Sequence, residues 1–346
     1  MRKRVIILAL VGLLLAAGIG GFVAWRLRQP PAVTRLLPFE ADAVIYISLQ
    51  PLRLATGFGR ETVSREPEYE GFVGETGIQF ERDLDEVAIA VHAPEAGANQ
   101  SPEHRYSEVF VGRYNGARLA KYLGKLAQQV EKYRDQDIFV IPHEGRTVRA
   151  VLLGPGMVGV SNTLDSAPIH TMVDRYQKQG LPIGGPRLVY SYYRQVPLGS
   201  NAWAITSLPA PDGAGDGGSL PLPGGIAFTL PPHTVVVASL RFVTSLELRA
   251  LAITERSSDA EKLAGSISTF LGLFRSIEIS AQPKGPDAEV KSFFDSIAVK
   301  HEGKRVELTA EAPLGFVRKM VQEENAPVVA PDPKTSPKAT KTKRKP

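Results

Sequence analysis

The longest hydrophobic pattern in the sequence is a continuous apolar run from Val5 to Trp25, which contains no charged side chain. At about 1.5 Å per residue, a helix of this length spans the ~30 Å hydrocarbon layer of a membrane. Basic residues are more numerous before the run than directly after it. This asymmetry favours a cytoplasmic N-terminus and a body outside the cytoplasm. We therefore expect a single-pass signal anchor in the inner (cytoplasmic) membrane.

A cleaved signal peptide is the alternative interpretation of the same run. The apolar region of such a peptide is normally about 7–15 residues long and ends at small residues, and Ala16-Ala17-Gly18 offers a site of that kind. Apolar sequence continues beyond this site to Trp25. The full spanning length favours an uncleaved anchor.

Beyond the anchor, the spacing of apolar positions predicts both strands and helices. Asn115 is a candidate N-cap for a helix whose apolar stripe runs through Leu126 to Val130, and Ser258 with Glu261 forms a capping-box signature. A third helix is expected at 169–176. These elements predict an α+β fold, a largely antiparallel sheet with helices on one face. Strands are expected at 43–49, 87–92, 108–114, 138–141, 147–153, 157–160, 234–244 and 246–254.

One internal match suggests a duplication. The segments "DIFVIPHEGRTVRAVL" (from Asp137) and "DSIAVKHEGKRVELTA" (from Asp295) align without a gap, and each is expected to form a strand, a tight Glu-Gly turn and a returning strand. The body would then hold two related strand-strand-helix-strand-strand-helix units, which can share one domain. The predicted organisation is an anchor with basic flanks (1–28), a linker (29–35), a first unit (36–180), a second unit (181–325) with a flexible loop (209–225), and a disordered tail (326–346).

The amino-acid composition excludes several kinds of chemical site. The chain has no Cys, which excludes disulfides, thiol catalysis and Cys-ligated metal sites. The net charge of +5 arises at the two ends of the chain, because the anchor flanks and the tail are both basic, and the body is mildly acidic. No nucleic-acid-binding signature accompanies these charges, so we expect no nucleic-acid partner.

The repeated His-Glu-Gly turns are the candidate chemical site. If the two units pack by pseudo-symmetry, His143, Glu144, His301 and Glu302 can meet as a metal or acid–base site. The imidazoles of His143 and His301 would then lie within about 5 Å of each other. The alternative, which we favour, is that these are solvated hairpin tips in which Gly supplies a positive φ.

Two further motifs are explained better as turns. Gly154–Gly159, "GPGMVG", matches the dinucleotide fingerprint, but β-like sequence follows it where a helix would be required. The acidic group Glu81, Asp83, Asp85 and Glu86 lacks the spacing of a calcium loop. No P-loop and no G-x-S-x-G motif is present. We therefore predict no catalytic residue and no cofactor.

The basic tail is a candidate contact for polyanions. With an exported C-terminus, its partners would be lipid headgroups, an envelope protein or an anionic envelope polymer. A tail that only solubilises the chain is the alternative. The residues concerned are Lys334, Lys338, Lys341, Lys343, Arg344 and Lys345.

The segments "LLPFEADAVIYISLQPLR" (Leu36–Arg53) and "YEGFVGETGIQFERDLDEVAIAV" (Tyr69–Val91) resemble a family of uncharacterised bacterial single-pass membrane-anchored proteins. The resemblance covers about the first quarter of the chain. It implies a location and no activity. The functional expectation is a non-catalytic, envelope-facing binding or scaffold protein. The alternatives are an envelope hydrolase or metal-dependent enzyme that uses the His-Glu-Gly turns, and a lipid or small-ligand binding module.

Overall fold

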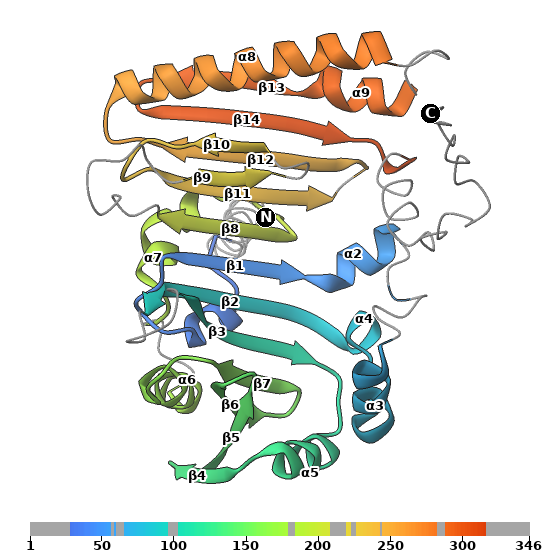
Figure 1. The fold of residues 1–346 in the computed structure, drawn as a ribbon, viewed down its shortest axis with the longest axis vertical. Helices are drawn as coiled ribbons and strands as arrows, with labels where there is room; N and C mark the ends of the chain where they lie inside the picture. Colours follow the sequence, from blue (N-terminus) through green and yellow to red (C-terminus); the bar gives the residue numbers. More distant parts are fainter. Residues whose placement is uncertain are drawn as a thin grey trace, which may run out of the picture.

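Figure 1 shows the fold in a computed structural model, which describes residues 28–56, 59, 66–95, 103–178, 184–207, 219–222, 226–242, 244–281 and 288–315. The expected membrane span, Val5 to Trp25, and the expected tail, 326–346, lie outside these residues. Within the described part of the chain, no helix is both long enough and apolar enough to cross a membrane.

A single 12-stranded sheet organises the fold, in the order β13-β14-β12-β11-β8-β1-β2-β3-β7-β6-β5-β4. Every neighbouring pair in it is antiparallel. The structure therefore confirms the predicted α+β class and the predicted antiparallel sheet. The strands are β1 (Ala43–Ser48), β2 (Leu84–Glu95), β3 (Glu103–Gly112), β4 (Gln129–Tyr133), β5 (Gln136–His143), β6 (Arg146–Gly154), β7 (Met157–Ser161), β8 (Ala202–Ser207), β11 (Val235–Phe242), β12 (Leu246–Ile253), β13 (Ala298–Glu302) and β14 (Arg305–Ala312), with β9 (Ser219–Leu222) and β10 (Ile226–Thr229) in a separate two-stranded sheet.

The pairing of β1 with β8 joins the two expected units. Val44 lies opposite Ile205, and Ile45 lies opposite Ala204. Strands from 36–180 form the part of the sheet from β1 to β4, and strands from 181–325 form the part from β8 to β13. The two segments therefore contribute to one continuous sheet.

The helices are short, apart from α8. Asn115 caps α5 as predicted, because its side chain accepts a 3.1 Å hydrogen bond from the backbone N–H of Arg118. α8 begins at Ser257, so Ser258 lies inside the first turn, and the predicted cap at Ser258 is wrong. The helices are η1 (Ala32–Leu36), α2 (Leu49–Thr56), α3 (Pro67–Thr76), α4 (Phe80–Asp83), α5 (Gly116–Leu126), α6 (Ala167–Gln177), α7 (Arg187–Tyr192), η2 (Tyr193–Gln195), α8 (Ser257–Ala281) and α9 (Ala288–Ser296).

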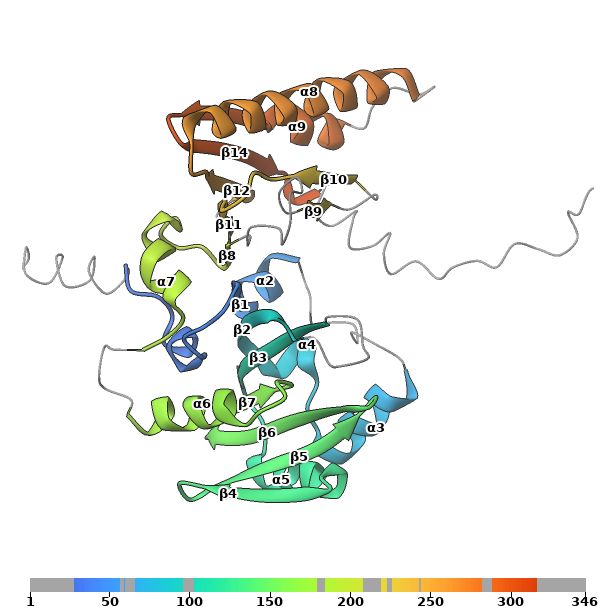
Figure 2. The same ribbon diagram turned by 60° about the vertical axis from the view of Figure 1, so that its left-hand side comes forward.

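One face of the sheet, which we call the core face, carries the main hydrophobic core. Alternate residues of each strand point to it, and many of them are fully buried. η1, α6 and α7 cover this face, as the view in Figure 2 shows from the side. The fully buried core includes Val44, Ala88, Ala90, Val109, Ile138, Val151 and Ile205 from the sheet, and Leu37, Ile169, Met172 and Val173 from the segments that cover it.

Helices also pack on the opposite face, so the prediction of helices on one face is wrong. Near one end, Ala260 and Leu263 of α8 pack against Val306 and Ala252. Near the other end, α3 and α5 pack against β7 in a separate cluster. The reason is the composition of the strands. Apolar residues occupy both alternating sets of positions, so helices that pack on either face remove apolar side chains from water.

Two local predictions also differ from the structure. α5 ends at Leu126 and the chain turns back as β4, so Val130 is a strand residue and does not continue the helical stripe. The expected loop 209–225 contains β9, which pairs with β10. Pro and Gly content indicated a loop there, whereas Ser219–Leu222 and Ile226–Thr229 form a short hairpin.

The two matching segments are not equivalent in register. In the β5–β6 hairpin, His143 pairs with Arg146, and the turn residues are Glu144 and Gly145. In the β13–β14 hairpin, Glu302 pairs with Arg305, so Gly303 and the residue after it form the turn. A slip of one residue sends aligned side chains to opposite faces. The expected Glu-Gly turn is therefore present in the first segment only, and the gapless sequence match does not correspond to a structural repeat.

Candidate functional site

The face of the sheet opposite the core face is apolar over its middle strands, and we call its paired positions from β12 to β3 the apolar face. Side chains at paired positions of neighbouring strands are adjacent on this face. For example, Ile45 of β1 lies between Ile89 of β2 and Ala204 of β8. These side chains are half-buried, in contrast to their fully buried neighbours on the core face. The half-buried apolar members are Ala43, Ile45, Ile47, Val87, Ile89, Val91, Phe110, Ala202, Ala204, Ala238, Leu240, Phe242, Leu246, Leu248 and Ala250.

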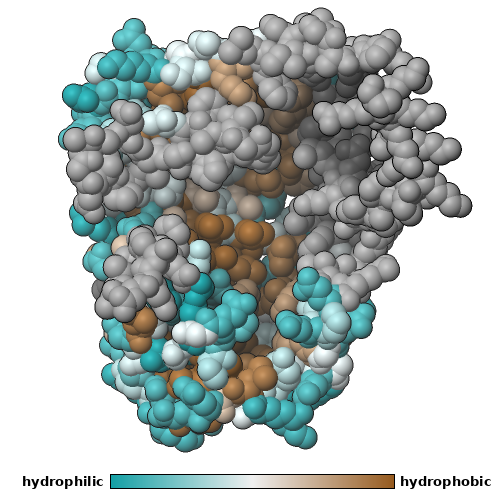
Figure 3. Space-filling model, viewed as in Figure 1, coloured by the Kyte–Doolittle hydropathy of each residue, from teal (hydrophilic) through white to brown (hydrophobic). Residues whose placement is uncertain are grey.

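Helices wall the apolar face at both ends of the sheet. The cluster of α8 with β14, β12 and β11 closes one end, through Leu263, Val306 and Val236. The cluster of α5 and α3 with β7 closes the other, through Leu119, Phe72 and Val158. In the space-filling view, apolar surface gathers along the middle of this face, with hydrophilic surface to its left and below it (Figure 3).

Glu108 is the one charged side chain among the paired positions of the apolar face from β12 to β3. It lies in register between Ile89 and Val160. Burial raises the pKa of its carboxyl above the ordinary value, because removal from water disfavours the charged form. Within the described part of the chain, the carboxyl has no hydrogen-bond or ion-pair partner. An apolar occupant with a cationic or hydrogen-bond-donating group would supply that partner.

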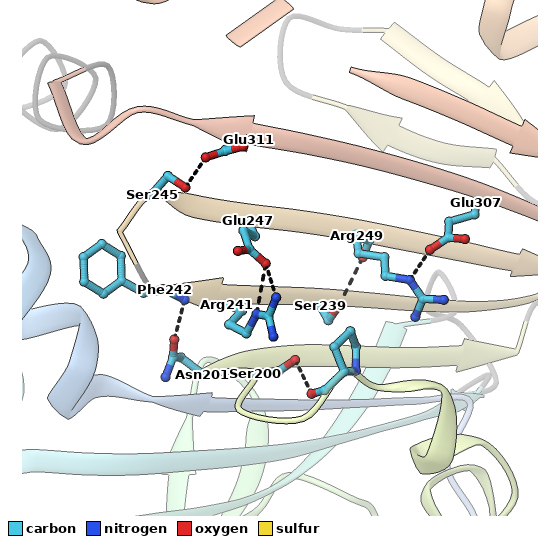
Figure 4. A network of polar contacts seen from close by, with 11 residues as sticks. Ser200, Asn201, Ser239, Arg241, Phe242, Ser245, Glu247, Arg249, Glu307 and Glu311 are labelled. Atoms are coloured by element: carbon cyan, nitrogen blue, oxygen red, sulfur yellow. Dashed lines mark hydrogen bonds and ion pairs between the residues drawn. The ribbon is translucent and has the colours of Figure 1, made fainter. Parts of the chain in front are cut away.

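Beyond the buried Val237 and Leu251, the core face carries polar side chains over β11, β12 and β14 (Figure 4). Arg241 pairs with Glu247, and Arg249 pairs with Glu307. Ser245 donates a hydrogen bond to Glu311. These side chains pair with one another across neighbouring strands. Such cross-strand pairs stabilise a sheet.

The repeated His-Glu-Gly turns do not form a common site. β5, which ends at His143, and β13, which carries His301, are separated by nine other strands in the sheet. At about 4.8 Å per strand, the two turns lie tens of ångströms apart along the sheet. Glu144 and Glu302 share this separation. The metal or acid–base site that requires them to meet is therefore incompatible with the fold, and no metal-binding group of three His, Asp or Glu occurs among the described residues.

The two remaining motifs serve the fold. Gly154 ends β6 and Met157 begins β7, so "GPGMVG" spans a hairpin turn as expected. A Cβ at Gly156, whose φ is 67°, would lie 2.4 Å from the carbonyl oxygen of Gly112. Only glycine fits this turn against that backbone.

The acidic group is dispersed over separate contacts. Glu81 is buried and accepts a 2.6 Å hydrogen bond from the Tyr69 hydroxyl. Asp83 accepts a hydrogen bond from the backbone N–H of Gln79. Asp85 forms an ion pair with Arg53, and Glu86 accepts a hydrogen bond from Tyr46. The four carboxylates therefore do not converge on one ligand, and Leu84 already begins β2 where a longer polar turn was expected.

The apolar face is the feature that sequence reasoning missed. A run such as Ala43–Ser48 is apolar at successive positions, and this pattern predicts a strand buried on both faces.

Comparisons with known proteins give the fold only distant neighbours. No family model matches the chain, and no curated protein matches it. Crystal forms III, I and IV of a protein named TP0453 are similar, with 11%, 9% and 10% sequence identity and TM-scores of 0.44, 0.45 and 0.42. The matches cover 84%, 84% and 86% of this chain and 97%, 97% and 98% of the TP0453 chain.

Proposed function

We propose that the protein is a membrane-tethered, envelope-facing binding protein without catalytic function, and that its apolar face receives an apolar surface of a partner polypeptide. The observation that carries the proposal is the row of half-buried apolar side chains between two helical walls. Contiguous apolar surface that the fold leaves only partly buried is typical of interaction sites. The tether is the apolar run Val5–Trp25, which places the body beside the inner membrane.

The breadth of the apolar face supports a polypeptide over a small ligand. β8, β1, β2 and β3 lie between the two walls, a width of about 19 Å at ~4.8 Å per strand. A small-ligand site encloses most of its ligand in a cavity, whereas the half-buried apolar side chains of this face are spread over several neighbouring strands. On the core face, the space below the helices is filled by fully buried side chains such as Met172 and Ile205.

Glu108 adds a chemical requirement for the partner. A carboxylate that loses water on binding needs a compensating charge or hydrogen bond. We therefore infer that the partner places a Lys, an Arg or another hydrogen-bond donor among its apolar residues, opposite Glu108. An anionic amphiphile would be repelled at this position.

Site-specific photo-crosslinking in cells tests the proposal. A photoreactive side chain is placed at Ile89 on the apolar face of the full-length protein, and the control is placed at Thr309, a half-buried residue on the core face of β14. A discrete adduct the size of a second polypeptide, formed at position 89 and absent at 309, is the expected result. A small mass increase typical of a lipid, or no adduct at either position, would contradict a polypeptide partner.

A further inference from the structure

A second surface lies on the opposite side of the sheet, where the described chain begins. Two aromatic side chains are unusually exposed there: Phe39 is 51% exposed and Tyr190 is 83% exposed. The segments that carry them are adjacent, because the backbone N–H of Arg187, at the start of α7, donates a 3.1 Å hydrogen bond to the carbonyl of Phe39. Two exposed aromatic rings on the outer side of a well-packed layer require an explanation.

α7 has one side buried in the core and one side exposed to solvent. Leu188 and Val189 are buried in the core. Arg187, Tyr190 and Arg194 follow at spacings of three and four, which places them on the outward side of the helical segment, and all three are exposed. An aromatic ring between two arginines is the combination found at membrane–water interfaces, where the ring enters the headgroup layer and the cations meet anionic lipids.

The neighbouring segment adds further positive charge. Arg28 is exposed and Arg35 is half-buried at the edge of η1. Among the described residues, Arg28, Arg187 and Arg194 have no ion-pair partner. Their charges are therefore available to a polyanion.

The position of the expected membrane span brings this surface to the bilayer. Seven residues lead from Trp25 to the start of η1 at Ala32, a connection of at most about 25 Å at ~3.5 Å per residue. η1 and α7 lie on one side of the sheet, and α3, α8 and α9 extend to the other (Figure 2). The short connection therefore holds the side with Phe39 and Tyr190 close to the membrane.

We infer that this surface docks onto the headgroup layer of an anionic bilayer beside the anchor, and that the apolar face consequently opens away from the membrane. The docking surface comprises Arg28, Arg35, Phe39, Arg187, Tyr190 and Arg194. The inference rests on the proposed membrane tether. It adds an orientation: a partner reaches the apolar face from the aqueous side.

Depth measurements on the full-length protein test the docking. The chain has no Cys, so Tyr190→Cys gives a single site for a nitroxide label, and Val130→Cys gives a control at the edge strand β4, where Val130 is 46% exposed. Both proteins are placed in vesicles of pure phosphatidylcholine and in vesicles with 30% phosphatidylglycerol (about one lipid in three, a strongly anionic surface). The label at 190 should be shielded from a water-soluble relaxation agent in the anionic vesicles, and the label at 130 should stay accessible in both.

A charge variant separates electrostatic docking from simple proximity. Arg187→Gln with Arg194→Gln should lower the ratio of docked to undocked protein by roughly thirtyfold, at about 1 kcal/mol per arginine, and high salt should act in the same direction. Equal accessibility at 190 and 130 in anionic vesicles, with the protein still floating with the vesicles, would overturn the docking and leave the tether intact. Failure of the protein to float with either kind of vesicle would overturn both.

Discussion

The two faces of the sheet can be distinguished by substituting adjacent residues of β1. Val44 is 0% exposed on the core face, and Ile45, the next residue, is half-buried on the apolar face. Aspartate at position 44 loses about 1.5–3 kcal/mol of apolar burial and places an unpaired carboxylate in the core, which costs several kcal/mol more. The total is comparable to the whole stability of a typical domain, about 5–15 kcal/mol. We expect Val44→Asp to prevent folding.

Aspartate at position 45 has a much smaller expected effect. About half of the apolar burial is lost, and the carboxylate keeps much of its water, so the free energy of unfolding should fall by only about 2 kcal/mol. Thermal unfolding of the full-length protein in detergent, followed by circular dichroism, should show a midpoint lowered by roughly 5 °C. If Ile45→Asp is as destabilising as Val44→Asp, the apolar face is an interior surface of the protein and cannot be a binding site.

Three further predictions concern single residues. Asn115→Ala should lower the free energy of unfolding by about 1 kcal/mol, because the Arg118 N–H loses its acceptor; Asn115→Ser should restore most of it in the same unfolding assay. Gly156→Ala should lower the unfolding midpoint, because the residue has a φ of 67° and its Cβ would meet the carbonyl oxygen of Gly112; an unchanged midpoint would show that the hairpin can shift. The raised pKa of Glu108 means that the native state binds its proton more readily than the unfolded state, so native stability falls as the pH rises above about 4.5. Glu108→Gln should therefore be more stable than the natural protein at neutral pH, with the difference vanishing in acid, as measured by unfolding at several pH values.

The elements were largely predictable from local sequence. β1, β5, β6 and β7 follow apolar runs bounded by turn residues, and the Asn115 cap follows from the chemistry of its side chain. Val130 was misassigned because its spacing continues a helical stripe, and only the pairing of β4 with β5 shows that the helix has already ended. Such pairings are tertiary, and local periodicity does not contain them.

The candidate site was much less predictable, for a related reason. Ile45 and Val44 are equally apolar, and no local pattern distinguishes the fully buried core face from the half-buried apolar face. The His-Glu-Gly match illustrates the converse error. Local identity around His143 and His301 suggested equivalent turns, whereas strand pairing shifts one turn by a residue and places the two hairpins at opposite ends of the sheet.

The accessibility of the apolar face in the native membrane tests the central claim most directly. Since the chain has no Cys, Ile89→Cys offers one thiol on the apolar face, and Val130→Cys offers an exposed control thiol on the edge strand β4. The rate of reaction with a water-soluble maleimide is measured in purified protein and in native membranes. A thiol at 89 that reacts when purified and is protected in native membranes, with the thiol at 130 reacting equally in both, is the predicted result. Equal reaction at 89 in both preparations would contradict a bound partner.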